Sequence, residues 1–164
     1  MDEQLTLDSE RAALTNFLDA QRDGLIRKLE GLDDLTARST PTVSSLSLLG
    51  LVKHCATWEE RWFHVVMAGE PASDGWPEVR PEPRDADCLV GGSDTVEHWV
   101  ARYRREIERS RSVVTHRDLD SRCARTDIIE CNVRYVLLHL IEETARHAGH
   151  ADIISESIDG SRGF

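Results

Sequence analysis

Four stretches of helical periodicity set the tightest limit on how this chain can fold. In each of them apolar residues recur at steps of three and four, which is the pattern of an α-helix with one apolar face. They cover residues 9–32, 46–69, 94–114 and 132–157. Strand-like alternation of apolar and polar residues is nearly absent. Four such helices bury their apolar faces most simply by packing together, so we predict an all-α four-helix bundle.

The segments between the helices extend this prediction. Pro41 interrupts the first connection, and residues 70–93 hold the other four prolines without any sustained period. We therefore predict a long connection between the second and third helices, of the kind that often packs over a functional site. A length of 164 residues suits one domain, and we expect a single bundle domain over residues 1–164.

Polar residues able to cap a helix precede each of the four stretches. The candidates are Asp8 or Ser9, one of Ser44, Ser45 and Ser47, then Ser93 or Asp94, and finally Asn132. Their side-chain oxygens can accept hydrogen bonds from the free backbone N–H groups of the first turn. Gly160 closes the fourth helix, because glycine readily adopts the left-handed conformation that ends helices.

The composition argues against nucleic acid and membranes as partners. The formal net charge is -10, whereas binding to phosphate backbones requires clustered Lys and Arg. No stretch approaches the about 20 consecutive apolar residues of a membrane-spanning helix. The N-terminus, MDEQLTLDSERAAL, is acidic and polar and does not resemble a signal peptide, so we expect a cytoplasmic protein. Apolar bundle faces often pair, which leaves a homodimer open.

The fourth stretch carries polar residues where a bundle helix normally places Leu or Ile. In HLIEETARHAGH, residues 139–150, the polar positions that share one side of the helix are His139, Glu143, His147 and His150. A buried carboxylate without a partner costs several kcal/mol, so something must satisfy Glu143. A metal ion, a histidinium or an arginine would do so.

Helix geometry restricts the metal alternative. Two residues four positions apart are separated by about 6 Å along the axis and can bind one ion. The spacing permits three pairs: His139 with Glu143, Glu143 with His147, and His147 with His150. His139 and His147 lie about 12 Å apart along the axis, too far to join Glu143 in one tetrahedral site. A third ligand must come from another helix, and His54 lies in the inward line of the second stretch.

A polar core without metal is the competing interpretation of the same residues. In that case His147 is ionised against Glu143, and His54 is hydrogen-bonded to a carbonyl group. The four cysteines are scattered and are expected to be free thiols. Cys55 adjoins His54 but points about 100° away from it on a helix, which argues against a ligand role. The remaining histidines are expected at the surface: His64, His98 and His116.

Two stretches resemble the DinB-like superfamily of metal-binding four-helix proteins. They are SLLGLVKHCATWEERWF, residues 47–63, and VLLHLIEETARHAGHADIISESIDG, residues 136–160. The resemblance is to the branch of mini-circle proteins, which is related to the N-terminal metal-binding domain of mycothiol-dependent maleylpyruvate isomerase. It spans most of the chain. The isomerase has a further C-terminal domain, so isomerase activity itself is not expected here.

The resemblance implies a ligand set and a chemistry. The metal ligands would be His54, Glu143 and His147, holding Zn²⁺ or another divalent metal such as Ni²⁺. His139 and His150 would be catalytic, orienting ligands or moving a proton. The activity would be that of a thiol S-transferase, in which the metal activates a low-molecular-weight thiol such as mycothiol for attack on a small electrophile.

Three further predictions remain open at this point. The chain could be a metal-binding or stress-response protein without turnover, or a metal-dependent hydrolase. Three arginines could bind a carboxylate or hydroxyl group of the substrate, although ordinary ion pairs are the simpler expectation for them. These are Arg61, Arg134 and Arg146.

Overall fold

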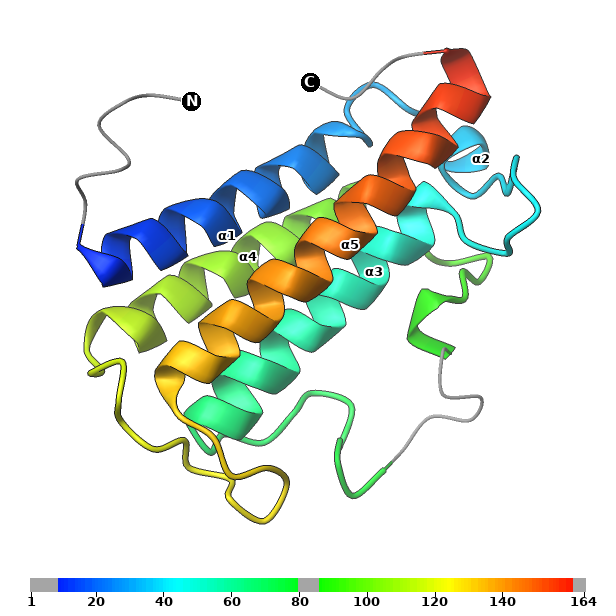
Figure 1. The fold of residues 1–164 in the computed structure, drawn as a ribbon. Helices are drawn as coiled ribbons and strands as arrows, with labels where there is room; N and C mark the ends of the chain where they lie inside the picture. Colours follow the sequence, from blue (N-terminus) through cyan, green and yellow to red (C-terminus); the bar gives the residue numbers. More distant parts are fainter. Residues whose placement is uncertain (1–8, 80–85, 161–164) are drawn as a thin grey trace.

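The computed structural model describes residues 9–79 and 86–160, and these form an all-α bundle (Figure 1). Its four main helices are α1 (Glu10–Arg27), α3 (Leu48–Glu59), α4 (Val96–Thr115) and α5 (Val133–Asp159). A short helix, α2 (Asp34–Ala37), lies between α1 and α3. Across the described ranges no β-strand forms, and the predicted four-helix fold is confirmed.

The helix ends follow the capping residues in three of four cases. The Ser9 side chain accepts a hydrogen bond from the backbone N–H of Ala12, and Ser47 and Asn132 cap α3 and α5 in the same way. Gly160 ends α5 with a φ of 75°. Helix α4 is capped by Thr95, so the prediction of Ser93 or Asp94 was wrong. Asp8 lies outside the described residues.

The second predicted helix is continuous but changes its winding. After α3, residues Glu60–Met67 form a π-helix, in which the N–H of Ala68 bonds the carbonyl oxygen of Phe63 at 3.1 Å. Bonds that reach back five residues widen the turn, and such segments are often found at functional sites. Over eight residues the apolar pattern cannot distinguish this winding from an α-helix, which is why the sequence predicted only a helix.

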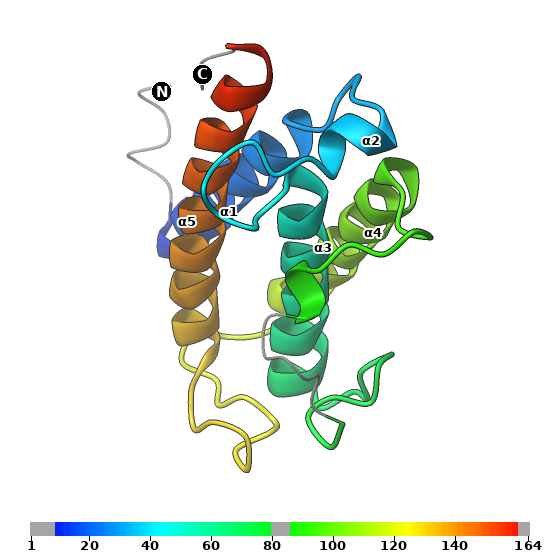
Figure 2. The same cartoon turned by 90° about the vertical axis from the view of Figure 1, so that its right-hand side faces the viewer.

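The long connection between the second and third main helices returns to pack on α3. It contains a 3-10 turn, Ala86–Cys88, that lies beside α3 (Figure 2). Gly50 of α3 makes the approach possible, because a Cβ atom built on it would overlap the backbone carbonyl oxygen of Cys88. Residues 80–85 of the predicted connection lie outside the described part.

The core consists of two groups of buried apolar side chains, one toward each end of the bundle. One group includes Leu25, Leu51, Tyr103 and Ile154, and the other includes Leu18, Phe63, Val136 and Leu140. In both groups, residues of α3 or of its π-helical extension pack against residues of α5. This packing positions the polar residues that lie between the two groups. No helix in the described ranges is long and apolar enough to span a membrane.

Candidate functional site

A cavity of about 300 Å³ lies between α3 and α5. The second stretch contributes His54, Cys55, Trp58, Glu59 and Trp62, and α5 contributes His139, Leu140, Glu143, Thr144 and His147. Every ligand suggested by the resemblance therefore lines the same cavity. No Lys or Arg is among its lining residues.

Two imidazole rings from different helices meet in this cavity. The ring centroids of His54 and His147 are 4.7 Å apart, with the rings nearly perpendicular. Nε2 of His147 lies 3.6 Å from Oε2 of Glu143, one helical turn earlier on α5. The other oxygen of Glu143 pairs with Arg146 at the rim. Helices α3 and α5 thus present two imidazoles and a carboxylate to the same cavity.

His147 has a partly buried imidazole whose two ring nitrogens are both buried. Neither Nδ1 nor Nε2 has a hydrogen-bond partner among the residues that the structure describes. Burial, together with the charge of His54, lowers the pKa of His147 to about 4. The ring is therefore neutral near pH 7, and one of its nitrogens carries a lone pair. Buried polar atoms of this kind call for a ligand or an ion.

The Nδ1 side of the His54 ring contacts Asp87, a residue of the 3-10 turn. Nδ1 of His54 lies 3.0 Å from Oδ1 of Asp87. Burial would lower the pKa of His54, but hydrogen bonds with Asp87 and Cys88 outweigh it and raise the pKa to about 9. The pKa values of the two cavity histidines are therefore shifted in opposite directions, and divergent pKa values of neighbouring groups are typical of functional sites.

Asp87 collects donors from three side chains of the second stretch. Besides His54, its Oδ2 accepts a hydrogen bond from Nε1 of Trp58 at 2.8 Å and one from Nη1 of Arg61 at 3.3 Å. Burial would raise the pKa of Asp87, but the hydrogen bonds from His54 and Trp58 outweigh it and lower the pKa. The carboxylate is therefore ionised although its side chain is only 6% exposed.

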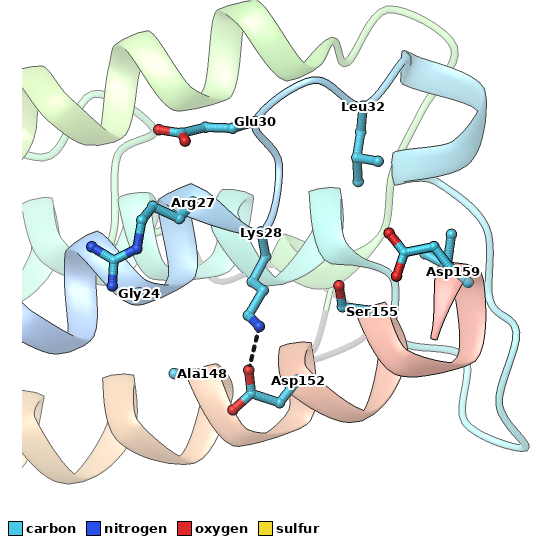
Figure 3. A pocket seen from close by; sticks show the side chains of 10 residues that line it. Gly24, Arg27, Lys28, Glu30, Leu32, Ala148, Asp152, Ser155 and Asp159 are labelled. Carbon is cyan, nitrogen blue, oxygen red and sulfur yellow. Dashed lines mark ion pairs between the residues drawn. The ribbon is translucent and has the colours of Figure 1, made fainter. Parts of the chain in front are cut away.

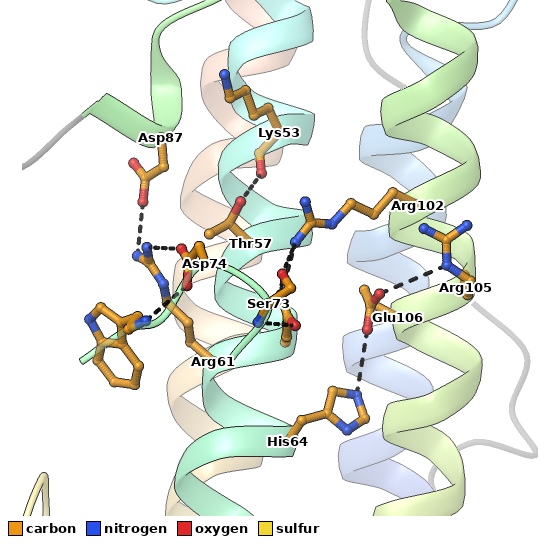
Figure 4. A network of polar contacts seen from close by, with 12 residues as sticks. Lys53, Thr57, Arg61, His64, Ser73, Asp74, Asp87, Arg102, Arg105 and Glu106 are labelled. Atoms are coloured by element: carbon orange, nitrogen blue, oxygen red, sulfur yellow. Dashed lines mark hydrogen bonds and ion pairs between the residues drawn. The ribbon is translucent and has the colours of Figure 1, made fainter. Parts of the chain in front are cut away.

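Arg61 forms an ion pair with this carboxylate and holds it against the bundle (Figure 4). Its guanidinium lies over the rings of Trp58 and Trp76, at 4.8 and 5.4 Å from their centroids. It also donates to Asp74 at 2.8 Å. With two carboxylates already bound, Arg61 is a structural ion-paired residue. Arg134 and Arg146 are likewise paired, with Glu10 and Asp120 and with Glu142 and Glu143.

A second set of possible ligands shares His54. Among residues 9–79 and 86–160, the ligand atoms of His54, Asp87 and Cys88 are the set of three that lie within 4.8 Å of one another. No sequence pattern pointed to Asp87 or Cys88, because they lie in a segment without periodicity. Cys55 is not a comparable candidate, since burial raises the pKa of its thiol.

The two remaining histidines of α5 occupy different surroundings. The His139 ring lies 4.4 Å from that of Trp62 and stacks parallel to Tyr135 at 6.0 Å, at the edge of the cavity. The His150 ring lies 5.8 Å from that of His147, and its Nδ1 is buried without a hydrogen-bond partner in the described part of the chain.

His64 contradicts the prediction of a surface position. Its ring is 2% exposed and points toward α4 (Figure 4), with Nε2 3.7 Å from Glu106 and Nδ1 3.5 Å from Glu70. His98 and His116 are exposed as expected. Apolar periodicity places a residue on a helix face, but His64 faces a polar interface with α4 that periodicity does not reveal.

A separate cavity of about 280 Å³ lies between the C-terminal parts of α1 and α5 (Figure 3). Its most prominent polar contact is the ion pair of Lys28 and Asp152 at 2.7 Å. Neither histidine nor cysteine lines it, so it lacks the groups that bind soft metals or thiols.

Comparison with known proteins agrees with this geometry. A solved structure of a conserved protein from Enterococcus faecalis shares the fold, with a TM-score of 0.72 and 14% sequence identity over 94% of this chain and 99% of that one. No curated protein matches the sequence. The family model described as mycothiol-S-transferase matches residues 13–160, which include α3, α5 and the whole cavity between them. The chain belongs to the mycothiol-S-transferase family.

Proposed function

We propose that this protein is a metal-dependent S-transferase that joins the thiol of mycothiol to a small electrophile. The observation that carries the proposal is the His147 ring, whose two buried nitrogens have no hydrogen-bond partner in the described residues while His54 and Glu143 share its cavity. Membership of the family supports mycothiol as the thiol.

We assign His54, Glu143 and His147 as the ligands of a divalent cation. Two imidazoles and one carboxylate are the donors found in catalytic zinc sites with an open coordination position, and Zn²⁺ is our first choice over Ni²⁺. The orphaned nitrogens of His147 fit such an ion, because they satisfy no other group. A bound cation of this kind lowers the pKa of a coordinating thiol, so that thiolate is present near neutral pH.

The remaining residues of the cavity have roles that follow from their positions. Trp58, Trp62 and Leu140 give it apolar walls, which exclude water and strengthen the electrostatic interactions inside. His139 lines the same cavity, and we assign a ring nitrogen of His139 to accept the proton that the thiol loses. His150 is assigned to support His147, whose ring it approaches. The thiolate sulfur then forms a bond to the electrophilic carbon, and the leaving group departs from that carbon with the electron pair of the bond that breaks.

The alternatives make different demands on the same protein. A hydrolase would consume its substrate without any thiol, and a metal-binding protein without turnover would bind the ion and consume nothing. Purified protein with stoichiometric Zn²⁺ should therefore be incubated with chlorodinitrobenzene, with and without mycothiol. Conjugate formation that requires both mycothiol and metal supports the transferase.

Substitutions test the ligand assignment in the same assay. His54→Ala, Glu143→Gln and His147→Ala should each lose bound zinc, as measured by elemental analysis, and lose conjugate formation. His98→Ala, at an exposed position on α4, is the control and should keep both. Stoichiometric zinc in all three cavity variants would show that the ligand assignment is wrong.

A further inference from the structure

Asp87 and His54 form a hydrogen-bonded pair. The donors and acceptors around this pair indicate which ring nitrogen of His54 carries a hydrogen. We propose that Asp87 is a positioning residue: it holds a proton on Nδ1 of His54 and thereby leaves the lone pair of Nε2 for a ligand in the cavity. The inference deepens the proposed function and rests on it for the identity of that ligand. Nothing in the sequence pattern singled out Asp87.

The first step concerns what Asp87 can do at Oδ2. The groups that face this oxygen are Nε1 of Trp58 and Nη1 of Arg61, at 2.8 and 3.3 Å. An indole N–H and a guanidinium can donate hydrogen bonds but cannot accept them. Oδ2 must therefore act as an acceptor, and two donors already occupy it.

The second step concerns Oδ1 and His54. Ionised carboxylates are acceptors only, so the 3.0 Å contact between Oδ1 and Nδ1 requires a hydrogen on Nδ1. In a neutral imidazole with a hydrogen on Nδ1, the lone pair is on Nε2. Histidines that bind metals commonly donate their other ring N–H to a carboxylate in this way, which fixes both the tautomer and the orientation of the ring.

The third step concerns how Asp87 itself is kept in place. Arg61 joins it to Asp74, and the same guanidinium lies against two tryptophan rings that contact each other. The 3-10 turn that carries Asp87 packs directly against Gly50 on α3. The carboxylate is thus fixed by the connection and by α3 together, and His54 is oriented by a residue outside its own helix.

The same hydrogen bonds argue against Asp87 as a ligand of the cation. Three donors use its two oxygens, and a cation bound between Asp87, Cys88 and His54 would have to displace the hydrogen on Nδ1. The geometry favours a ligand on the Nε2 side of His54, in the cavity that it shares with His147.

The test is the substitution Asp87→Asn, with Asp74→Asn as its matched control. The amide introduced by Asp87→Asn can keep its oxygen toward Trp58 and Arg61, which turns its NH₂ group toward Nδ1 of His54. The hydrogen should then move to Nε2. Asp74→Asn removes the same charge from the other partner of Arg61 without touching His54.

Two measurements follow the change. Proton–nitrogen correlation NMR of the metal-free protein, recorded at a pH at which the His54 ring is neutral, reports which ring nitrogen carries the hydrogen. We expect Nδ1–H in the wild type and in Asp74→Asn, and Nε2–H in Asp87→Asn. Competition with a chromophoric chelator should show zinc affinity about 10–100-fold weaker in Asp87→Asn only.

Several outcomes would overturn the inference. Nε2–H in the wild type would do so, and this measurement stands even if Asp87→Asn does not fold. Unchanged zinc affinity and an unchanged tautomer in Asp87→Asn would do so as well. So would a thiolate charge-transfer band in the Co²⁺-substituted protein that disappears in Cys88→Ser, because Asp87 and Cys88 would then be ligands. The tautomer is read without metal or turnover, so failure of the proposed transferase activity is recognised separately.

Discussion

Gly50 of α3 lies so close to the backbone carbonyl of Cys88 that a methyl group on its Cα would overlap the oxygen. Gly50 is one helical turn before His54, and Cys88 adjoins Asp87. Because Gly50 has no side chain, the connection can pack close to α3. This packing places the carboxylate of Asp87 beside the His54 ring that it orients. The contact links an ordinary packing constraint to the candidate metal site.

Substituting this glycine should disturb stability and metal binding together. We expect Gly50→Ala to lower the free energy of unfolding by about 1–3 kcal/mol, the usual cost of overpacking a buried position. Zinc affinity should fall as well, because the turn that carries Asp87 must move. Chelator competition and urea denaturation measure the two effects.

The control for that substitution is Gly149→Ala. Gly149 lies in the interior of α5, and a Cβ atom there would meet no atom within 4 Å. Alanine is the better helix former, so stability should rise by up to about 1 kcal/mol. A Gly50→Ala protein with wild-type stability and zinc affinity would contradict the close approach of the turn.

Arg22 and Glu59 form a buried ion pair at the wall of the cavity, which Glu59 lines, with side chains 4% and 2% exposed. Arg22→Met leaves the carboxylate of Glu59 without its partner, which should cost about 3–5 kcal/mol of unfolding free energy. The double variant Arg22→Met with Glu59→Leu should recover most of this loss, because no unpaired charge remains. Thermal or urea unfolding measures both.

An exposed arginine provides the comparison for Arg22. Arg134 pairs with Glu10 and Asp120 at the surface, and Arg134→Met should cost less than about 1 kcal/mol. Equal losses for Arg22→Met and Arg134→Met would show that burial does not govern the strength of these pairs.

His64 should make stability depend on pH. Burial and the nearby charge of Arg109 lower its pKa, against the opposing charges of Glu70 and Glu106. The unfolded chain keeps a histidine pKa near about 6.5, so below that pH it takes up a proton that the folded protein refuses. The contribution is complete above about pH 6.5 and is lost as the pH falls toward the lowered folded value.

Removing the imidazole tests this dependence. In His64→Leu, unfolding free energies measured by urea denaturation between about pH 5 and 7 should fall less steeply with decreasing pH than in the wild type. His116→Leu, at the exposed residue that follows the last residue of α4, should keep the wild-type slope. Parallel slopes for wild type and His64→Leu would assign the dependence to other groups.

His139 can be tested without disturbing its packing. Phenylalanine preserves the contacts with Trp62 and Tyr135 but cannot accept a proton. We expect His139→Phe to keep stoichiometric zinc and to lose about 10²-fold or more in conjugation rate, the usual effect of removing a general base. A rate within a few-fold of wild type, at full metal content, would leave His139 a wall residue only.

Most of the fold could be predicted because it depends on local signals. Apolar periodicity located all four main helices, and for three of them the observed caps, Ser9, Ser47 and Asn132, are among the predicted candidates. The π-helical winding of Glu60–Met67 left no such signal, and neither did the choice of Thr95 over Asp94. Asp94 instead accepts hydrogen bonds from Gly91 and Trp99 and from Lys53 on α3, and the bond from Lys53 is a tertiary contact that local pattern does not reveal.

The candidate site was predictable only in part, for the same reason. His54, Glu143 and His147 could be found because helical spacing places them on inward faces. Asp87 could not, because it reaches the site through a connection without periodicity. The ligand roles, the single-domain extent over residues 1–164 and the homodimer stay predictions.

The two imidazoles that meet at 4.7 Å come from helices far apart in the chain, α3 and α5. Contacts between segments distant in the chain carry a loop-closure cost in entropy, so they depend on the packing of the whole bundle. Any widening of the seam between these helices would separate His54 from His147 while leaving both helices intact. For an ion held as we propose, its loss would then be an early sign of unfolding, detectable before the circular dichroism of the helices changes.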